Sequence, residues 1–225
     1  TMASYEENYE ELKNLIEEIE KKLNNINKIK KKDEEIFFTI GNTAYNESKN
    51  RPYLTPTRKI NYGYVFGIVI YSQLQAIVIS NYIDNKVNAI FVDCEKKLPV
   101  STENDYSVLN KFKLVPSIDN VVIGEKEFGN ISKTCHNVIT HTPIFSYKAN
   151  DLIVESVWLF LIHFYKELSG KKIVIIGGGN IGCKLCLKFI ECAARVNVVT
   201  KKDQSKIFDS LNLIKQKSVI EKINI

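Results

Sequence analysis

Residues 171–200 constrain the fold of this chain more than any other part of its sequence. An apolar run at 173–176 leads directly into the sequence Gly-Gly-Gly-Asn-Ile-Gly at 177–182, and an amphipathic stretch then leads to a second apolar run at 196–199. This order predicts a strand, a glycine turn, a helix and a second strand.

Each spaced glycine of the turn meets a separate physical requirement. Gly177 permits the tight turn, Gly179 lets a ligand approach the backbone, and Gly182 lets the helix pack on the strand. The helix N-terminus offers free N–H groups and the positive end of the helix dipole to a nucleotide or carboxylate. The alternative is a tight turn that binds nothing. The predicted cofactor-binding residues are Gly177, Gly179, Asn180, Ile181, Gly182, Thr200 and Lys201.

Composition narrows the class of protein. The chain has 225 residues, of which 44% are hydrophobic, and this is enough to form a hydrophobic core. Its net charge of +5 is modest and its lysines are scattered, so nucleic-acid binding is not expected. The apolar run at 64–79 contains three polar residues and is interpreted as buried core, not a membrane span. Five cysteines and no signal peptide predict free thiols in the cytoplasm.

Residues 1–35 predict an N-terminal amphipathic helix, because apolar residues recur at steps of four and three among many Glu and Lys residues. Such a helix either pairs with a second copy, giving a homodimer, or lies on its own domain. The apolar positions are Tyr5, Tyr9, Leu12, Ile16, Ile19, Leu23 and Ile26.

Residues 36–150 predict an α/β region on the substrate side of the protein. Continuous apolar strands on either side of a helix imply a parallel sheet that helices cover on both faces. The predicted elements are a loop at 41–61, a strand at 64–71, a helix at 72–83, a strand at 89–93, a helix at 101–112 and short apolar strands at 121–123 and 138–140.

Residues 151–225 predict the ligand-binding region. A helix at 151–168, capped by Asp151 and ended by Gly170, precedes the glycine strand, and a helix at 205–217 and a strand at 219–225 follow it. The whole chain is therefore predicted to be α/β, with a Rossmann-like parallel sheet. A complete dinucleotide-binding fold uses two such halves, and 151–225 supply only one of them.

Polar residues follow several predicted strands, and parallel sheets bind ligands at these carboxyl ends. The predicted substrate site includes Tyr71, Ser72, Thr140 and Thr142, with Asp93 and Cys94 nearby. His141 could take a proton near neutral pH, or only bond a loop carbonyl. The C-x-x-C of Cys183 and Cys186 is interpreted as packing, because no second ligand pair accompanies it, and no metal site is expected.

Two separated stretches resemble S-adenosylhomocysteine hydrolases. Leu-Ser-Gly-Lys at 168–171, the glycine turn and Ala-Arg-Val at 194–196 are similar to the cofactor domain of that family. Upstream, residues 71–76 and the Ser-Thr-Glu-Asn-Asp run at 101–105 are similar to its substrate-side motifs. The resemblance implies substrate contacts for Thr102 and Asp151 and a catalytic role for Lys148.

Two departures from that family bear on the cofactor. Tyr71 stands where the family has a His, and Lys201 stands where it has the acidic residue that holds the NAD ribose. A lysine at that place disfavours ordinary NAD. We therefore expect S-adenosylmethionine as the cofactor, with NADP as the alternative, its 2′-phosphate held by Thr200, Lys201 and Lys202.

The main functional prediction is a small-molecule methyltransferase of cofactor biosynthesis. The chain resembles, in this respect, the pyridinol methyltransferases of iron-guanylylpyridinol cofactor synthesis, which combine a small Rossmann chain with S-adenosylmethionine. The alternatives are an NAD(P)-dependent oxidoreductase, an enzyme of the S-adenosylhomocysteine hydrolase type, and a non-catalytic dimeric binding protein.

Overall fold

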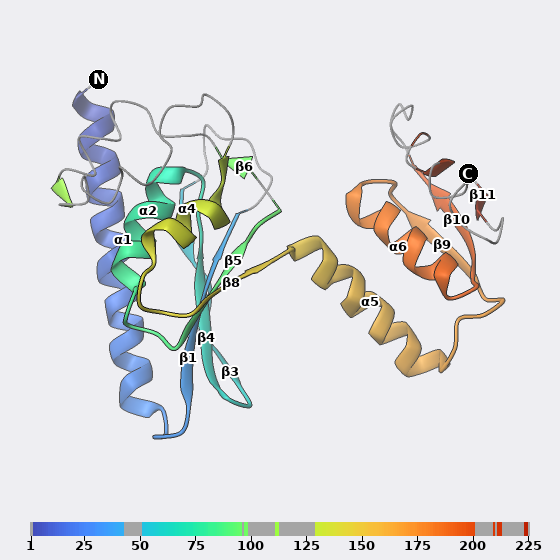
Figure 1. Cartoon of the computed structure of the whole chain (residues 1–225), viewed down its shortest axis with the longest axis horizontal. Coiled ribbons are helices and arrows are strands. Elements are labelled where there is room, and N and C mark those ends of the chain that lie inside the picture. The colour runs from blue at the N-terminus through green and yellow to red at the C-terminus, as the bar shows by residue number, and fades with distance from the viewer. Residues whose placement is uncertain are drawn as a thin grey trace. The chain divides into compact units, whose positions relative to one another are not determined.

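The computed structural model describes residues 2–42, 51–95, 97–98, 111–112, 129–200, 209, 211–212 and 223–224. They belong to two compact units, unit 1 over Thr1–Tyr147 and unit 2 over Lys148–Ile225 (Figure 1). Unit 2 thus begins three residues before Asp151, where the ligand-binding region was predicted to begin. The two units are described separately below.

Unit 1 is built on a mainly parallel sheet. Its parallel strands lie in the order β4-β1-β5-β8, and two short strands pair antiparallel with β4. Strand β1, the first parallel strand along the chain, therefore lies between β4 and β5, the next two parallel strands. The winding of the sheet reverses between β1 and β5. The strands are β1 (Glu35–Gly41), β2 (Tyr53–Leu54), β3 (Arg58–Ile60), β4 (Gly63–Val69), β5 (Ala89–Asp93) and β8 (Ile144–Tyr147), with a separate antiparallel pair of β6 (Lys97–Leu98) and β7 (Gly129–Asn130).

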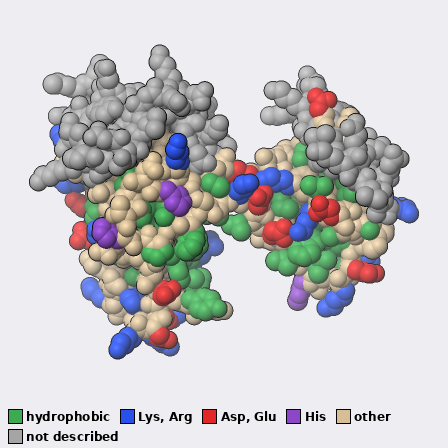
Figure 2. Space-filling model, in the orientation of Figure 1, with side chains coloured by type: hydrophobic (Ala, Val, Ile, Leu, Met, Phe, Trp, Pro, Cys, Tyr) green, Lys and Arg blue, Asp and Glu red, His purple; other side chains and the backbone are tan. Residues whose placement is uncertain are grey.

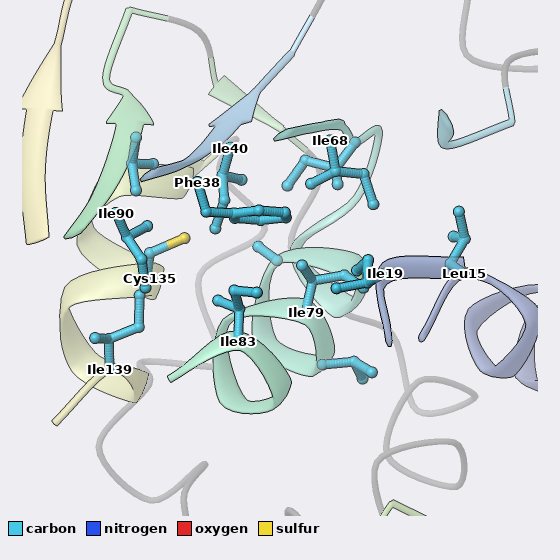
Figure 3. Packing of buried hydrophobic residues seen from close by; sticks show 14 of the residues in the cluster. Leu15, Ile19, Phe38, Ile40, Ile68, Ile79, Ile83, Ile90, Cys135 and Ile139 are labelled. Atoms are coloured by element: carbon cyan, nitrogen blue, oxygen red, sulfur yellow. The ribbon is translucent and has the colours of Figure 1, made fainter. Parts of the chain in front are cut away.

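Three described helices, α1 (Met2–Ile29), α2 (Gln73–Ile83) and α4 (Ile131–Val138), cover one face of this sheet (Figure 1). Figure 3 shows Phe38 and Ile40 of β1 packed towards Ile79 of α2, with Cys135 of α4 beside Ile90. The predicted α/β class with a parallel sheet is confirmed. In the described residues, however, the helices of unit 1 lie on one face, whereas the sequence predicted helices on both.

The other face of the sheet carries a row of aromatic rings. Phe37 and Phe91 have ring centroids 6.2 Å apart, and Phe91 and Phe145 have centroids 5.5 Å apart. Phe145 is 51% exposed. Successive side chains of a strand point to opposite faces of the sheet. The residues next to these phenylalanines, such as Phe38 and Ile90, therefore point into the helix-covered core and are buried.

Helix α1 packs on its own unit. Leu12, Ile19, Leu23 and Ile26 are all buried in the core that α1 shares with α2 and the sheet. Tyr9 and Ile16 are partly buried against the same core. The apolar face of this helix is thus explained by packing on its own domain, which was one of the two predicted possibilities. The other, a homodimer, stays a prediction.

Unit 2 contains a three-stranded parallel sheet in the order β11-β10-β9. Helices α5 and α6 pack against each other, and Ile175, Phe189 and Val196 lie in the core of the unit. The predicted strand, glycine turn, helix and strand are confirmed. The elements are α5 (Ala149–Tyr165), β9 (Lys172–Ile176), α6 (Asn180–Glu191), β10 (Arg195–Val199) and β11 (Ile223–Asn224).

Several predicted elements need correction. The predicted loop at 41–61 contains β2 and β3, and β1 was not predicted at all. The short strand predicted at 138–140 is wrong, because Val138 ends helix α4. Asp151 does not cap α5: Lys148 occupies the N-cap position, and Asp151 lies in the first turn. The strand at 121–123, most of the helices at 101–112 and 205–217, and Thr102, Lys201 and Lys202 lie outside the described residues.

None of the helices within the described ranges is long and apolar enough to cross a membrane.

Candidate functional site

The glycine turn connects β9 to α6 in unit 2. Gly177 has φ +110°, which lies in the region that L side chains rarely adopt and that favours glycine. Its N–H donates to the carbonyl oxygen of Val199 at 2.7 Å, which holds the turn against the end of β10. Thr200, the next residue, therefore lies at the carboxyl edge of the sheet beside the turn.

Gly182 and Gly179 have different structural roles. A Cβ on Gly182 would lie 1.9 Å from the carbonyl oxygen of Gly177, so only glycine lets α6 pack this closely on the turn. A Cβ on Gly179 would have nothing within 4 Å. Packing therefore does not require glycine at 179, and the space before that backbone is open to a ligand.

The N-terminus of α6 begins at this open space. Gly179 is the N-cap residue, and no side chain caps the helix. The N–H groups of Asn180, Ile181 and Gly182 belong to the first turn, where a helix has no internal acceptors. They can accordingly donate to a phosphate, and the helix dipole favours its negative charge. The thiol of Cys183 donates to the carbonyl oxygen of Gly178 at 3.4 Å, and this hydrogen bond joins α6 to the turn.

Two ion pairs join helices α5 and α6 of unit 2. The Nζ of Lys184 lies 2.6 Å from Oδ1 of Asp151, and the Nζ of Lys188 lies 2.8 Å from Oε1 of Glu155. Figure 2 shows acidic and basic side chains side by side on the visible face of this unit. Asp151, predicted as a substrate contact, thus pairs with Lys184, while Lys148 makes no side-chain capping bond at the start of α5.

Tyr71 and Ser72 lie at the carboxyl edge of the unit 1 sheet, as predicted. Oγ of Ser72 accepts the N–H of Gln75 at 3.2 Å and caps α2, and Oε1 of Gln75 accepts the N–H of Tyr71 at 2.7 Å. The segment is therefore held by its own side chains. Gln73, which is buried, accepts a bond from the hydroxyl of Thr134 at 2.6 Å.

Two residues at this edge, Asp93 and Tyr147, face each other across β5 and β8. Asp93 is 2% exposed and accepts the N–H of Glu95 at 2.9 Å. Burial, and then the negative charge of Asp93, raise the pKa of the Tyr147 hydroxyl, which therefore stays protonated at neutral pH. The sequence did not indicate Tyr147, because β8 was not recognised as a strand.

Thr140, His141 and Thr142 lie at the opposite edge of the sheet. They precede β8, whose first residue, Ile144, pairs with Ile90 in β5. The expectation that they follow a strand is therefore wrong. All three bind Asp84 at the end of α2, and Nδ1 of His141 lies 3.1 Å from Oδ2 of Asp84. His141 is thus separated from Tyr71 and Ser72 by the length of the strands.

The two cysteines of the C-x-x-C sit on α6. Cys186 is fully buried in the core of unit 2, and burial followed by the neighbouring Cys183 raises its pKa to about 11. Burial also raises the pKa of Cys183. Both thiols are therefore protonated at neutral pH. Within the described ranges, no group of three His, Cys, Asp or Glu residues is placed to hold a metal ion.

Comparison with known proteins adds one finding about unit 2. Residues 164–223 match the model of a protein family described as putative NAD(P)-binding. The match includes β9, the glycine turn, α6 and β10. None of the curated proteins matches the chain.

Two solved structures show a weak similarity. Phosphoglycerate oxidoreductase from Vibrio cholerae has 14% identity and a TM-score of 0.25, and covers 66% of this chain. One of the chains of dipicolinate synthase from Bacillus halodurans has 12% identity and a TM-score of 0.25, and covers 80% of it. The chain spans 52% and 66% of their lengths, respectively. A TM-score of 0.25 does not establish a shared fold.

Proposed function

We propose that unit 2 binds NAD or NADP at the glycine turn and that the protein is an NAD(P)-dependent oxidoreductase. The observation that carries this proposal is the open backbone at Gly179, directly before the uncapped N-terminus of α6. A dinucleotide pyrophosphate needs both features, because its oxygens must approach the backbone closely and accept N–H bonds. The family match over 164–223 supports the same ligand.

Of the two cofactors, NADP fits the end of β10 better. Thr200 follows β10 in the sequence, and Lys201 and Lys202 come next. An acidic residue at this place would hold the 2′-hydroxyl of NAD, whereas cations suit the 2′-phosphate of NADP. The bound nicotinamide would supply hydride transfer. The chain's own contribution at this turn is to bind the pyrophosphate at the N–H groups of Asn180, Ile181 and Gly182.

The methyltransferase interpretation receives no support from the comparisons, and no contact among the described residues of unit 2 favours S-adenosylmethionine over a dinucleotide. The dinucleotides and S-adenosylmethionine differ in whether they carry phosphate groups. A pyrophosphate uses the charge at the N-terminus of α6, whereas S-adenosylmethionine carries no phosphate.

Isothermal titration calorimetry on the full chain tests the proposal, with NADP, NAD, S-adenosylmethionine and S-adenosylhomocysteine as separate ligands. We expect NADP to bind most tightly, and the Lys201→Ala, Lys202→Ala double variant to bind it at least ~100-fold more weakly, since each charge-assisted bond contributes about 1.5–3 kcal/mol. The affinity for NAD should change little in that variant. Binding of S-adenosylmethionine without binding of either dinucleotide would overturn the proposal and restore the methyltransferase.

A further inference from the structure

A second candidate site lies in unit 1, where the winding of the sheet reverses. The chain passes from β1 to β4 on one side and returns to β5 on the other, so the reversal lies between β1 and β5. Ligands of open parallel sheets bind outside the carboxyl ends of the strands that flank such a reversal. Gly41 ends β1 and Asp93 ends β5, and the two strands are direct neighbours.

Asp93 is an unusual residue for this place because its charge is buried without a counter-ion. It is 2% exposed, and one of its oxygens, Oδ1, accepts the N–H of Glu95. In the part of the chain that the structure describes, no Lys, Arg or His forms an ion pair with it, and its recorded hydrogen bond goes to Oδ1 alone. An ionised carboxylate is costly to bury unless a cation and hydrogen bonds compensate it.

Tyr147 places a hydroxyl next to this carboxylate. The two residues are paired across neighbouring parallel strands, so their side chains emerge on the same face of the sheet. The hydroxyl oxygen of Tyr147 lies 3.6 Å from the position that a Cβ on Gly41 would occupy, which places it over the end of β1. A Cβ at position 41 would therefore be in ordinary van der Waals contact with this hydroxyl. The Tyr147 oxygen can accept a further hydrogen bond.

We propose that this edge of unit 1 binds the ammonium group of a small primary amine, with Asp93 as its counter-ion and the Tyr147 hydroxyl as a second acceptor. An ammonium group has three N–H donors and a positive charge, and it supplies the counter-ion that the buried carboxylate lacks. A neutral alcohol would supply the donor but not the charge. The proposal is independent of dinucleotide binding by unit 2.

Calorimetric titration of the full chain with n-butylamine, glycine and 1-butanol tests this site. Butylamine should bind and 1-butanol should not, because the two differ chiefly in charge. Free glycine, used as a ligand, tests whether the ammonium group belongs to an amino acid. Binding at least tenfold tighter than that of butylamine identifies an amino acid as the ligand. Equal or weaker binding identifies a simple amine. Failure of both amines to bind the wild type overturns the proposal.

Two variants assign the effect to the proposed residues. Asp93→Asn should weaken amine binding at least tenfold, and Tyr147→Phe should weaken it severalfold. Asp33→Asn is the matched control, since it removes one negative charge from an exposed residue outside every assigned site and should leave amine binding unchanged.

Thermal unfolding of the ligand-free variants supplies a second readout. Asp93→Asn should unfold at the same temperature as the wild type or a higher one, because it removes an uncompensated buried charge. A large decrease in its melting temperature, or unchanged amine binding by this variant, would contradict the proposal. Either result would show that Asp93 only stabilises the turn by accepting the N–H of Glu95.

Discussion

Oδ1 of Asp84 accepts the backbone N–H of Thr142 at 2.8 Å, which ties the C-terminal end of α2 to the segment that leads into β8. The same carboxylate accepts the N–H groups of Thr140 and His141. Its side chain is 9% exposed. The segment 140–142 was predicted from the sequence to supply a catalytic His141 and two substrate contacts. In the structure it forms a contact with Asp84 at the amino edge of the sheet.

Replacing Asp84 by Ala should destabilise unit 1 by about 2–3 kcal/mol, because several backbone N–H groups lose a charged acceptor at once. Urea unfolding monitored by circular dichroism measures the change. The exposed Asp33→Ala is a suitable control and should change the unfolding free energy by less than about 0.5 kcal/mol. A similar result for both variants would mean that water replaces Asp84 without cost.

The contribution of Asp84 should depend on pH. Burial disfavours its charge, but the N–H of Thr140, the ring of His141 and the N–H of Thr142 outweigh burial and hold its pKa well below the usual range. A depressed folded-state pKa gives stability that is fully present above the unfolded pKa of about 3.9 and is lost as pH falls below it. The stability difference between wild type and Asp84→Asn should accordingly stay constant between about pH 7 and pH 5 and shrink as pH falls below about 4. A constant difference would contradict the role of the ionised carboxylate.

The burial of α1 predicts that its apolar face stabilises unit 1. Ile19 is fully buried, and Ile19→Ala should lower the unfolding free energy by about 2–5 kcal/mol. Light scattering of the same variant tests the separate prediction of a homodimer. If α1 carried a dimer interface, the variant would shift towards monomer without a comparable loss of stability.

The sequence predicted unit 2 better than unit 1 for physical reasons. The spacing of Gly177, Gly179 and Gly182 is a local requirement, and each glycine has a cause that can be read without distant contacts. The site around Asp93 depends instead on strand neighbours far apart in the chain. Because 138–140 were taken as a strand, although α4 ends at Val138, His141 was assigned to the wrong edge of the sheet.

Gly179 and Gly182 should respond differently to substitution. Gly182→Ala should destabilise unit 2 by about 2 kcal/mol or more, since its Cβ would overlap the carbonyl oxygen of Gly177. Gly179→Ala should leave stability almost unchanged, because no atom lies within 4 Å of its Cβ position. Thermal unfolding of the two variants side by side makes the comparison. Equal destabilisation would show that glycine at 179 serves packing.

The central claim, that the open turn at Gly179 holds a dinucleotide, is tested most directly by energy transfer from tryptophan to NADPH. Trp158 is the single tryptophan of the chain and packs, partly buried, against the core of unit 2. We expect NADPH to quench its emission in the wild type, and Gly179→Val, with unchanged circular dichroism, to lose this quenching because its side chain fills the space of the pyrophosphate. Equal NADPH affinity in the wild type and in Gly179→Val, or no quenching in a folded wild type, would contradict the account.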